Sequence, residues 1–466
     1  MGKIKEHITT RQLRKVLDEH EEEEYGHTNW IDEETLKMIK KMKRQTIQER
    51  KEMLIENRDK MRKIFKESRG KKEKMTKNQK EHIRKVQGHL DIGFLSDLAK
   101  AIDHPDKGLI ENMVNGSPTV GPIQESGIWP VDPYFEEKNA VKETKKRKSF
   151  KLRTNPPEWM SHENRKRLWD ESANLRESGK IREVDSDKVQ MEPTYGFGVE
   201  QGDFEIREDG SKYYIKLRNC FDYRAVNNWS PSKEKLQLTT NKQIIQWIAA
   251  AAVDGGEKPP PILPGKKDVT SDVNEELGRA VEDDTNLQNE VKSWLEMMEK
   301  KTGNPSENVS EANEKSFFKQ KRTERKKRVD KSRKANRGFI PGFCKLDFKS
   351  YYYQFAPEKM ELNVIAIWDP NPSEDHPKGH WRYYESSVMH FGNLHSIFVA
   401  CRFSMLLESV IRKLLGIIAS IYIDDSICME RMELLKLMQE IVSELYEKIG
   451  WKMSTEKLES HADTQE

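Results

Sequence analysis

Two adjacent carboxylates between two apolar stretches are the first feature of this sequence that indicates chemistry. Residues 417–430 read IIASIYIDDSICME, so an isoleucine-rich run leads into Asp424 and Asp425, and a second apolar stub follows at once. This pattern predicts a strand, a tight turn and a returning strand. Two like charges in one turn are unfavourable unless a cation binds there, although Asp-Asp is also an ordinary solvated turn.

A third carboxylate follows another predicted strand. Residues 342–355 read GFCKLDFKSYYYQF, an apolar strand that ends at Asp347 and runs into aromatic residues. Two strands that bring Asp347, Asp424 and Asp425 to one edge of a sheet can hold two divalent ions ~3.5–4 Å apart, the arrangement used for in-line phosphoryl transfer. Mg²⁺ is a hard ion that prefers such oxygen ligands, so the carboxylates are candidates for a magnesium site.

These two motifs resemble those in the palm of retroelement reverse transcriptases, with Asp347 in the first catalytic motif and residues 422–425 (YIDD) in the second. Five motifs in all appear in the family's order. The other three are residues 216–229 (KLRNCFDYRAVNNW), 390–392 (HFG) and 450–459 (GWKMSTEKLE). The resemblance covers roughly residues 194–250 and 339–460.

The resemblance implies an α+β fold with the fingers and split βαβ palm of a right-hand polymerase, and an RNA-directed DNA polymerase as the function. It implies that Asp347 and Asp424 bridge two Mg²⁺ ions, with Mn²⁺ as a substitute, that the backbone carbonyl of Phe348 adds a ligand, and that Asp425 supports the site. Lys457 is the candidate acid for the leaving pyrophosphate, and a surface salt bridge is its alternative interpretation. The implied partners are an RNA or DNA template-primer and dNTPs.

Two arginines are candidates for contacts with the incoming nucleotide. The sequence predicts a β-hairpin with an Asp209-Gly210 turn, and the resemblance implies that Arg218 on its second strand packs on the nucleotide. Arg207, just before the turn, would reach the terminal phosphates, since guanidinium groups bind phosphate oxygens in a bidentate manner. Ordinary cross-strand surface charges remain the alternative for both residues.

Two further residues correspond to positions near the nucleotide sugar and the template. Tyr352 lies five residues after Asp347, where reverse transcriptases carry an aromatic ring that crowds the 2′ position and selects deoxynucleotides. Gly392 would allow close backbone approach in the loop that touches template and nucleotide. Core packing is the alternative for the tyrosines at 351–353, of which at most one is needed as the gate.

Composition divides the chain into five predicted regions. They are a charged helical arm (1–90), an N-terminal extension and linker (91–193), the fingers (194–252), a low-complexity, charged and disordered insertion (253–338) and the palm (339–466). The arm is expected to form long, exposed helices. Within the palm, strands are predicted at 363–368 and 381–389 and helices at 396–415 and 434–449, the second ending at Gly450.

The composition also limits partners and compartment. The 466-residue chain is 35% hydrophobic and 35% charged with a net charge of +3, so binding must depend on local charge patches. The four cysteines are far apart without a metal or disulfide pattern, which indicates a reducing intracellular setting, in the nucleus or cytoplasm. No stretch approaches ~20 continuous apolar residues, so no membrane span is predicted. The oligomeric state is not indicated.

Departures from the family's pattern keep a second function open. Ser350 and Tyr351 replace the acidic and small residues common after the first aspartate, His390 stands where proline is usual, and no thumb is expected after the last motif. The alternative is therefore a truncated, catalytically inactive remnant of a reverse transcriptase that binds nucleic acid. An RNA-dependent RNA polymerase shares the palm chemistry, but Tyr352 argues against it.

Overall fold

The computed structural model describes residues 33–135, 152–238 and 339–454, with short pieces at 244, 247, 250–251 and 459–460. These residues belong to two compact units. The smaller unit is Met1–Arg50 with Thr240–Pro341, and the larger unit is Lys51–Thr239 with Gly342–Glu466. The insertion predicted at 253–338 lies outside the described residues.

The smaller unit is helical in its described N-terminal part, where α2 (Glu33–Arg44) is followed by the start of α3 (Ile47–Glu67). The first turn of α3 is closed by a capping box. The Glu49 N–H donates to Thr46 Oγ1 (3.1 Å) and the Thr46 N–H donates to Glu49 Oε2 (2.8 Å). This pairing determines where α3 begins, because it satisfies two backbone donors at the helix start.

The larger unit combines helices with two β-sheets, which confirms the α+β class predicted from the sequence. Its described helices, besides most of α3, are α4 (Lys71–Lys77), α5 (Glu81–Gln87), α6 (Ile92–Ala101), α7 (Gly108–Asn115), α9 (His162–Glu177), α10 (Arg224–Asn227), α14 (Leu394–Ser409) and α15 (Leu435–Ile449). Its described strands are β1 (Ile181–Val184), β2 (Thr194–Ile206), β3 (Lys212–Phe221), β4 (Pro341–Asp347), β5 (Val364–Asp369), β6 (His380–Ser386), β7 (Ile418–Tyr422), β8 (Asp425–Arg431) and β9 (Glu459–Ser460).

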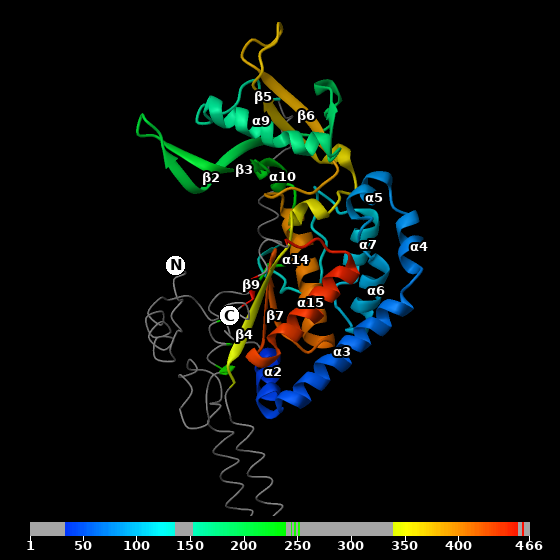
Figure 1. The fold of residues 1–466 in the computed structure, drawn as a ribbon. Coiled ribbons are helices and arrows are strands. Elements are labelled where there is room, and N and C mark those ends of the chain that lie inside the picture. Colours follow the sequence, from blue (N-terminus) through cyan, green and yellow to red (C-terminus); the bar gives the residue numbers. More distant parts are fainter. Residues whose placement is uncertain are drawn as a thin grey trace, which may run out of the picture. The chain divides into compact units, whose positions relative to one another are not determined.

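The first sheet has four strands in the order β7-β8-β4-β9. Figure 1 labels β4, β7 and β9 of this sheet, close to α14 and α15. β7 and β8 are antiparallel and Tyr422 pairs with Asp425, so the turn between them consists of Ile423 and Asp424 alone. This confirms the strand, tight turn and strand predicted for residues 417–430. α14 contacts β7 and α15 contacts β8. α15 ends at Gly450, as predicted, because the left-handed φ of 80° at that residue closes the helix.

The second sheet is five-stranded and mixed, in the order β1-β6-β5-β2-β3. β2 and β5 run parallel, whereas the other neighbouring strands are antiparallel. β2 and β3 form the hairpin predicted around Asp209-Gly210, and β5 and β6 lie at the predicted strands. The sequence placed β5 and β6 with the C-terminal region instead. The pairing of Thr194 with Ile365 joins them to β2 in one sheet.

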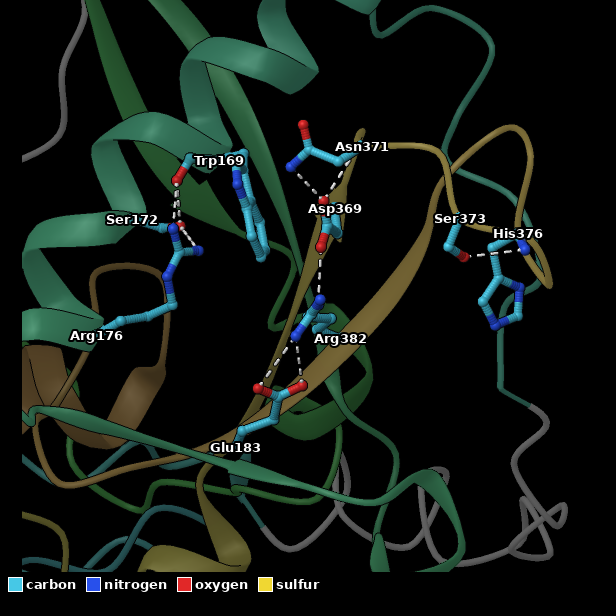
Figure 2. Close-up of polar contacts among 9 residues, drawn as sticks. All are labelled: Trp169, Ser172, Arg176, Glu183, Asp369, Asn371, Ser373, His376 and Arg382. Atoms are coloured by element: carbon cyan, nitrogen blue, oxygen red, sulfur yellow. Dashed lines mark hydrogen bonds and ion pairs between the residues drawn. The ribbon is translucent and has the colours of Figure 1, made fainter.

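A cross-strand ion-pair ladder ties three strands of the five-stranded sheet together (Figure 2). Arg382 on β6 donates from Nε to Asp369 Oδ2 on β5 (2.8 Å) and from Nη1 to Glu183 Oε1 on β1 (3.1 Å). The Arg382 guanidinium carbon also lies 5.6 Å from the centre of the Trp169 ring, a cation-π contact that holds α9 against the sheet. Asp369 is buried, so its pairing with Arg382 offsets the cost of desolvation.

Residues 51–90 pack onto the core of the larger unit, which differs from the exposed arm predicted for residues 1–90. Leu54 and Met61 of α3 are fully buried in the apolar cluster that contains α14 and α15. Arg62 of α3 forms a bidentate ion pair with Glu444 of α15, at 2.7 and 2.8 Å. The physical reason for this packing is the spacing of Leu54 and Met61. They lie seven residues, or two helical turns, apart and form a buried apolar stripe on an otherwise charged helix.

α14 is the central helix of this core and continues into a π-helical turn at Val410–Leu414. Among the described residues, Leu394–Leu414 is the one helix long and apolar enough to cross a membrane, but 78% of its apolar window is buried inside the protein. That burial is the property of a core helix. The described residues therefore contain no clear membrane-spanning helix, in line with the prediction of no membrane span.

A buried ion pair fixes α14 to the loop before α7. Arg402 and Asp106 are both 2% exposed. Arg402 donates from Nε to Asp106 Oδ2 (2.6 Å) and from Nη2 to Asp106 Oδ1 (2.7 Å). Asp106 Oδ1 also accepts from the backbone N–H groups of Gly108 (3.1 Å) and Leu109 (3.0 Å) at the start of α7. The carboxylate therefore holds two elements, and each charge depends on the other.

We expect Asp106→Asn to lower the free energy of unfolding by about 3–5 kcal/mol, because it leaves the Arg402 charge buried without a counter-charge. The double variant Asp106→Asn/Arg402→Met should lose less than the sum of the two single variants. Urea denaturation followed by circular dichroism measures both quantities. Lys188→Ala, which removes an exposed ion pair with Asp185, is the control and should leave the midpoint unchanged. A midpoint for Asp106→Asn equal to that of the control would contradict this account.

Candidate active site at the end of the four-stranded sheet

Backbone hydrogen bonds bring two of the predicted carboxylates together at one end of the four-stranded sheet. The Phe348 N–H donates to the carbonyl of Asp424 (3.0 Å), which joins the end of β4 to the β7-β8 turn. On the other side, the Ser454 N–H donates to the carbonyl of Asp347 (2.9 Å). Asp347, at the end of β4, and Asp424, in the β7-β8 turn, are therefore held near each other, with the start of the 450–459 motif beside them. Lys457 of that motif lies outside the described residues.

The turn that carries Asp424 has an unusual backbone. Ile423 has a φ of 56°, and a β-branched side chain is rarely found in this left-handed region. Such a conformation costs of order 1–3 kcal/mol and persists only where the surroundings hold it. The Ile423 side chain packs against two apolar clusters, and its carbonyl accepts a hydrogen bond from Ser404 Oγ of α14 (2.7 Å). The position of Asp424 thus depends on α14 as well as on the sheet.

The three carboxylates share a similar degree of burial. Asp347, Asp424 and Asp425 are all half-buried. Asp425 forms an ion pair with Lys345 of β4, with Nζ and Oδ1 3.1 Å apart. All three supply carboxylate oxygens, the donor type that suits Mg²⁺.

Within the described ranges, no group of three or more His, Cys, Asp or Glu side chains is arranged to hold a metal ion. Proteins commonly bind Mg²⁺ through one or two carboxylates, and substrate phosphates and water complete the coordination. The pair Asp347 and Asp424 fits that kind of site better than a site built from protein ligands alone. Phe348 contributes a buried ring, packed edge-on against Tyr446 with ring centres 5.4 Å apart.

The three consecutive tyrosines after β4 occupy different environments. Tyr351 is buried, and its hydroxyl contacts Ser404 and the carbonyl of Ala400. Tyr353 packs against the His390 ring, and burial raises the pKa of its hydroxyl to about 12. Tyr352 is half-buried beside Phe391, with ring centres 5.7 Å apart. Burial raises the pKa of Tyr352, and the neighbouring Cys401 and Asp424 add to this shift.

The loop before α14 is tightly fitted at Gly392. Its φ is 99°, and a Cβ atom there would lie 3.0 Å from the carbonyl oxygen of Phe221. Asn227, at the end of α10, holds the loop from both sides. Its Nδ2 donates to the Gly392 carbonyl (2.8 Å), and its Oδ1 accepts from the Leu394 N–H (2.9 Å). Gly392 therefore allows close approach of the Phe221 backbone; the approach of template and nucleotide stays a prediction.

His390 is a buried, neutral part of this loop. Burial lowers its pKa to about 3, so the ring is uncharged at neutral pH. Its Nε2 lies 2.8 Å from Ser386 Oγ, and its ring centre is 4.7 Å from that of Phe221. His390 thus acts as a packing residue with one hydrogen bond to Ser386.

The two candidate arginines lie on different faces of the β2-β3 hairpin. Arg207 forms a bidentate ion pair with Glu163 of α9 and stacks over Tyr213, 4.6 Å from the ring centre. Arg218 is exposed and sits opposite Val199. Because side chains alternate along a strand, Arg218 faces the side of β3 away from Tyr213. One surface therefore cannot present both guanidinium groups to a ligand without rearrangement of the Arg207 pair.

The sequence analysis did not single out three residues that shape this site: Lys345, Asn227 and Ser404. Asn227 lies inside the 216–229 motif, so its place there was the available signal. Lys345 lies two residues before Asp347, which puts it on the same face of β4. No signal in the sequence identified Ser404, because its partner Ile423 is distant along the chain and the interaction is with a backbone carbonyl.

Comparison with known proteins adds no relative. No protein-family model matches the sequence, and no curated protein matches it. The function of this chain must therefore be inferred from its residues and their geometry.

We expect Gly392→Ala to destabilise the protein more than Gly202→Ala. Both glycines have a positive φ, 99° and 77°, so each substitution should cost about 1–2 kcal/mol of backbone strain. A Cβ at Gly202 meets nothing within 4 Å, whereas at Gly392 it meets the Phe221 carbonyl at 3.0 Å. Gly202→Ala is thus the matched control for strain without crowding. Urea denaturation compares the two, and equal losses of stability would disprove the tight fit at residue 392.

Proposed function

We propose that this chain is an RNA-directed DNA polymerase of the reverse transcriptase type, which adds dNTPs to the 3′-hydroxyl of a primer. The observation that carries the proposal is the pairing of the β4 end with the β7-β8 turn through the hydrogen bond from the Phe348 N–H to the Asp424 carbonyl (3.0 Å). That bond brings Asp347, at the end of β4, close to Asp424 in the β7-β8 turn, and nucleotidyl transfer by two metal ions requires two carboxylates held close together.

The proposed anatomy assigns the four-stranded sheet with α14 and α15 to the palm of a right-hand polymerase. The order β4, α14, the β7-β8 hairpin, α15 and β9 follows the split βαβ pattern of that domain. The β2-β3 hairpin corresponds to the fingers, where exposed Arg218 is available to a nucleotide or template. The proposed partners are an RNA or DNA template-primer and dNTPs.

In the proposed reaction, Asp347 and Asp424 bind and orient the metal-bound triphosphate and the primer end. Two Mg²⁺ ions, when bound, would supply activation of the 3′-hydroxyl and charge stabilisation of the leaving pyrophosphate. Asp425 adds negative charge while its partner Lys345 keeps the local charge balanced. The Tyr352 ring, packed edge-on against Phe391 with ring centres 5.7 Å apart, would limit the room at the sugar.

Purified protein should extend a DNA primer on an RNA template with dNTPs and Mg²⁺. Asp424→Asn should lower the rate by at least about a hundredfold, because the loss of one ligand charge removes about 3 kcal/mol or more of transition-state stabilisation. Asp185→Asn, at an exposed carboxylate paired with Lys188, is the matched control and should retain full activity.

Absence of incorporation by a folded preparation, with either Mg²⁺ or Mn²⁺, would reject the polymerase proposal. Salt-sensitive binding of RNA or DNA by such a preparation would instead identify the catalytically inactive, nucleic-acid-binding remnant.

Tyr352→Val should raise the use of ribonucleotides relative to deoxynucleotides. Removal of the ring opens space for a 2′-hydroxyl, and discrimination by such a clash can shift by a few kcal/mol, about tenfold for each ~1.4 kcal/mol. Tyr353→Val is the control, because that ring packs against His390 and its loss should lower stability without altering the dNTP-to-NTP ratio. The ratio is measured by primer extension with each nucleotide set. A ratio that moves in Tyr353→Val and stays constant in Tyr352→Val would place the gate elsewhere.

A further inference from the structure

The outer edge of β7 is bonded by two side chains of α14. β7 is the first strand in the order β7-β8-β4-β9, so one of its edges has no strand partner among the described strands. Glu408 accepts a hydrogen bond from the Ile421 N–H at Oε2 (2.9 Å), and Ser404 donates to the Ile423 carbonyl (2.7 Å). Residues four apart lie on one helix face, so α14 acts at this edge as a neighbouring strand would.

The Ser404 bond acts on the peptide group directly before Asp424. The Ile423 carbonyl belongs to the peptide unit that contains the Asp424 nitrogen. The carbonyl of Asp424 itself accepts from the Phe348 N–H (3.0 Å). Both peptide planes that flank the Asp424 side chain are therefore fixed, one by α14 and the other by β4. Because Ile423 has the unfavourable φ of 56°, the turn keeps this conformation only when hydrogen bonds from other elements stabilise it.

Tyr351 extends this hold into a short chain of hydroxyl groups. Its hydroxyl lies 2.5 Å from Ser404 Oγ and 2.6 Å from the Ala400 carbonyl. The two hydroxyl groups carry one proton each but make three contacts: one with each other, one with the Ala400 carbonyl and one with the Ile423 carbonyl. The two carbonyls can only accept. Tyr351 donates to the Ala400 carbonyl and Ser404 donates to the Ile423 carbonyl, so the Tyr351 hydroxyl oxygen borders Ser404 Oγ and holds that side chain against the turn.

We propose that Ser404 and Tyr351 are positioning residues for the carboxylate of Asp424, acting in series through the Ile423 carbonyl. The inference rests on the proposed polymerase function and assigns a role to Tyr351, a large residue where the family usually has a small one. Both side chains are buried, at 1% and 3% exposure, so they contact neither nucleotide nor solvent and act only through the turn.

Primer-extension kinetics test the proposal with Ser404→Ala, Ser404→Thr and Tyr351→Phe. Ser404→Ala should lower kcat about tenfold, as expected for the loss of one buried hydrogen bond, and should leave the KM for dNTP within about twofold. It should also raise the Mg²⁺ concentration needed for half-maximal rate, because a displaced Asp424 binds the ion less well. Ser404→Thr retains the hydroxyl and should restore most of the rate.

The series arrangement predicts coupling between the two variants. Tyr351→Phe alone should lower kcat about threefold, and in the Ser404→Ala background it should add little, since the donor it supports is already absent. Ser420→Ala on β7 is the matched control. Ser420 is equally buried at 3% exposure, and its Oγ makes no hydrogen bond to a described residue, so kcat should stay within about twofold.

Hydrogen exchange of the amides at 421–426 provides a second readout that does not need catalysis. Exchange should be faster in Ser404→Ala and unchanged in Ser420→Ala. Unchanged exchange and unchanged kcat in Ser404→Ala, or additive effects in the double variant, would overturn the proposal. A folded wild-type protein without polymerase activity would reject the proposed function alone, and the exchange rates would still test the hold on the turn. If Ser404→Ala does not fold, Tyr351→Phe, which keeps the ring, provides both measurements.

Discussion

The candidate site depends on backbone pairing at one end of the four-stranded sheet. The hydrogen bond from the Phe348 N–H to the Asp424 carbonyl and the bond from the Ser454 N–H to the Asp347 carbonyl join three segments that are far apart in sequence. Backbone bonds of this kind set the separation of two carboxylates without using the carboxylates themselves.

The apolar layer beneath this end makes the backbone bonds effective. Phe348 and Tyr351 pack with Phe355, Phe403 and Trp451 in one aromatic cluster, in which Phe403 and Trp451 stack with centres 4.2 Å apart. Water is excluded there, so an unpaired carbonyl or hydroxyl would carry its full desolvation cost. The hydrogen-bond contacts of Tyr351 and Ser404 avoid this desolvation cost for their hydroxyl groups. The same contacts link the two side chains to the β7-β8 turn. Packing and positioning are thus served by the same residues.

Local patterns predicted more of this molecule than long-range pairing did. The strand-turn-strand around Asp424 and the helix stop at Gly450 were evident from the sequence, because period-two alternation and a terminal glycine act over a few residues. The partnership of β2 with β5 was not evident, because it joins strands separated by the whole 253–338 insertion. The burial of α3 was missed for a related reason. Its apolar stripe is narrow, and its partner Glu444 lies on a distant helix.

Two side-chain hydrogen bonds hold the segment before and at the start of α14, beside the ring contact of His390 with Phe221. Asn227 clamps the loop at Gly392, and Asn393 Nδ2 donates to the Thr119 carbonyl (3.0 Å) where α14 begins. An apolar junction would tolerate small shifts, whereas buried hydrogen bonds lose their energy steeply when their geometry changes. The N-cap residue of α14, Asn393, is therefore held by a hydrogen bond. Further along the same helix, Ser404 is hydrogen-bonded to the β7-β8 turn. The loop held by Asn393 and the turn that carries Asp424 are thus both hydrogen-bonded to side chains of one helix and its N-cap.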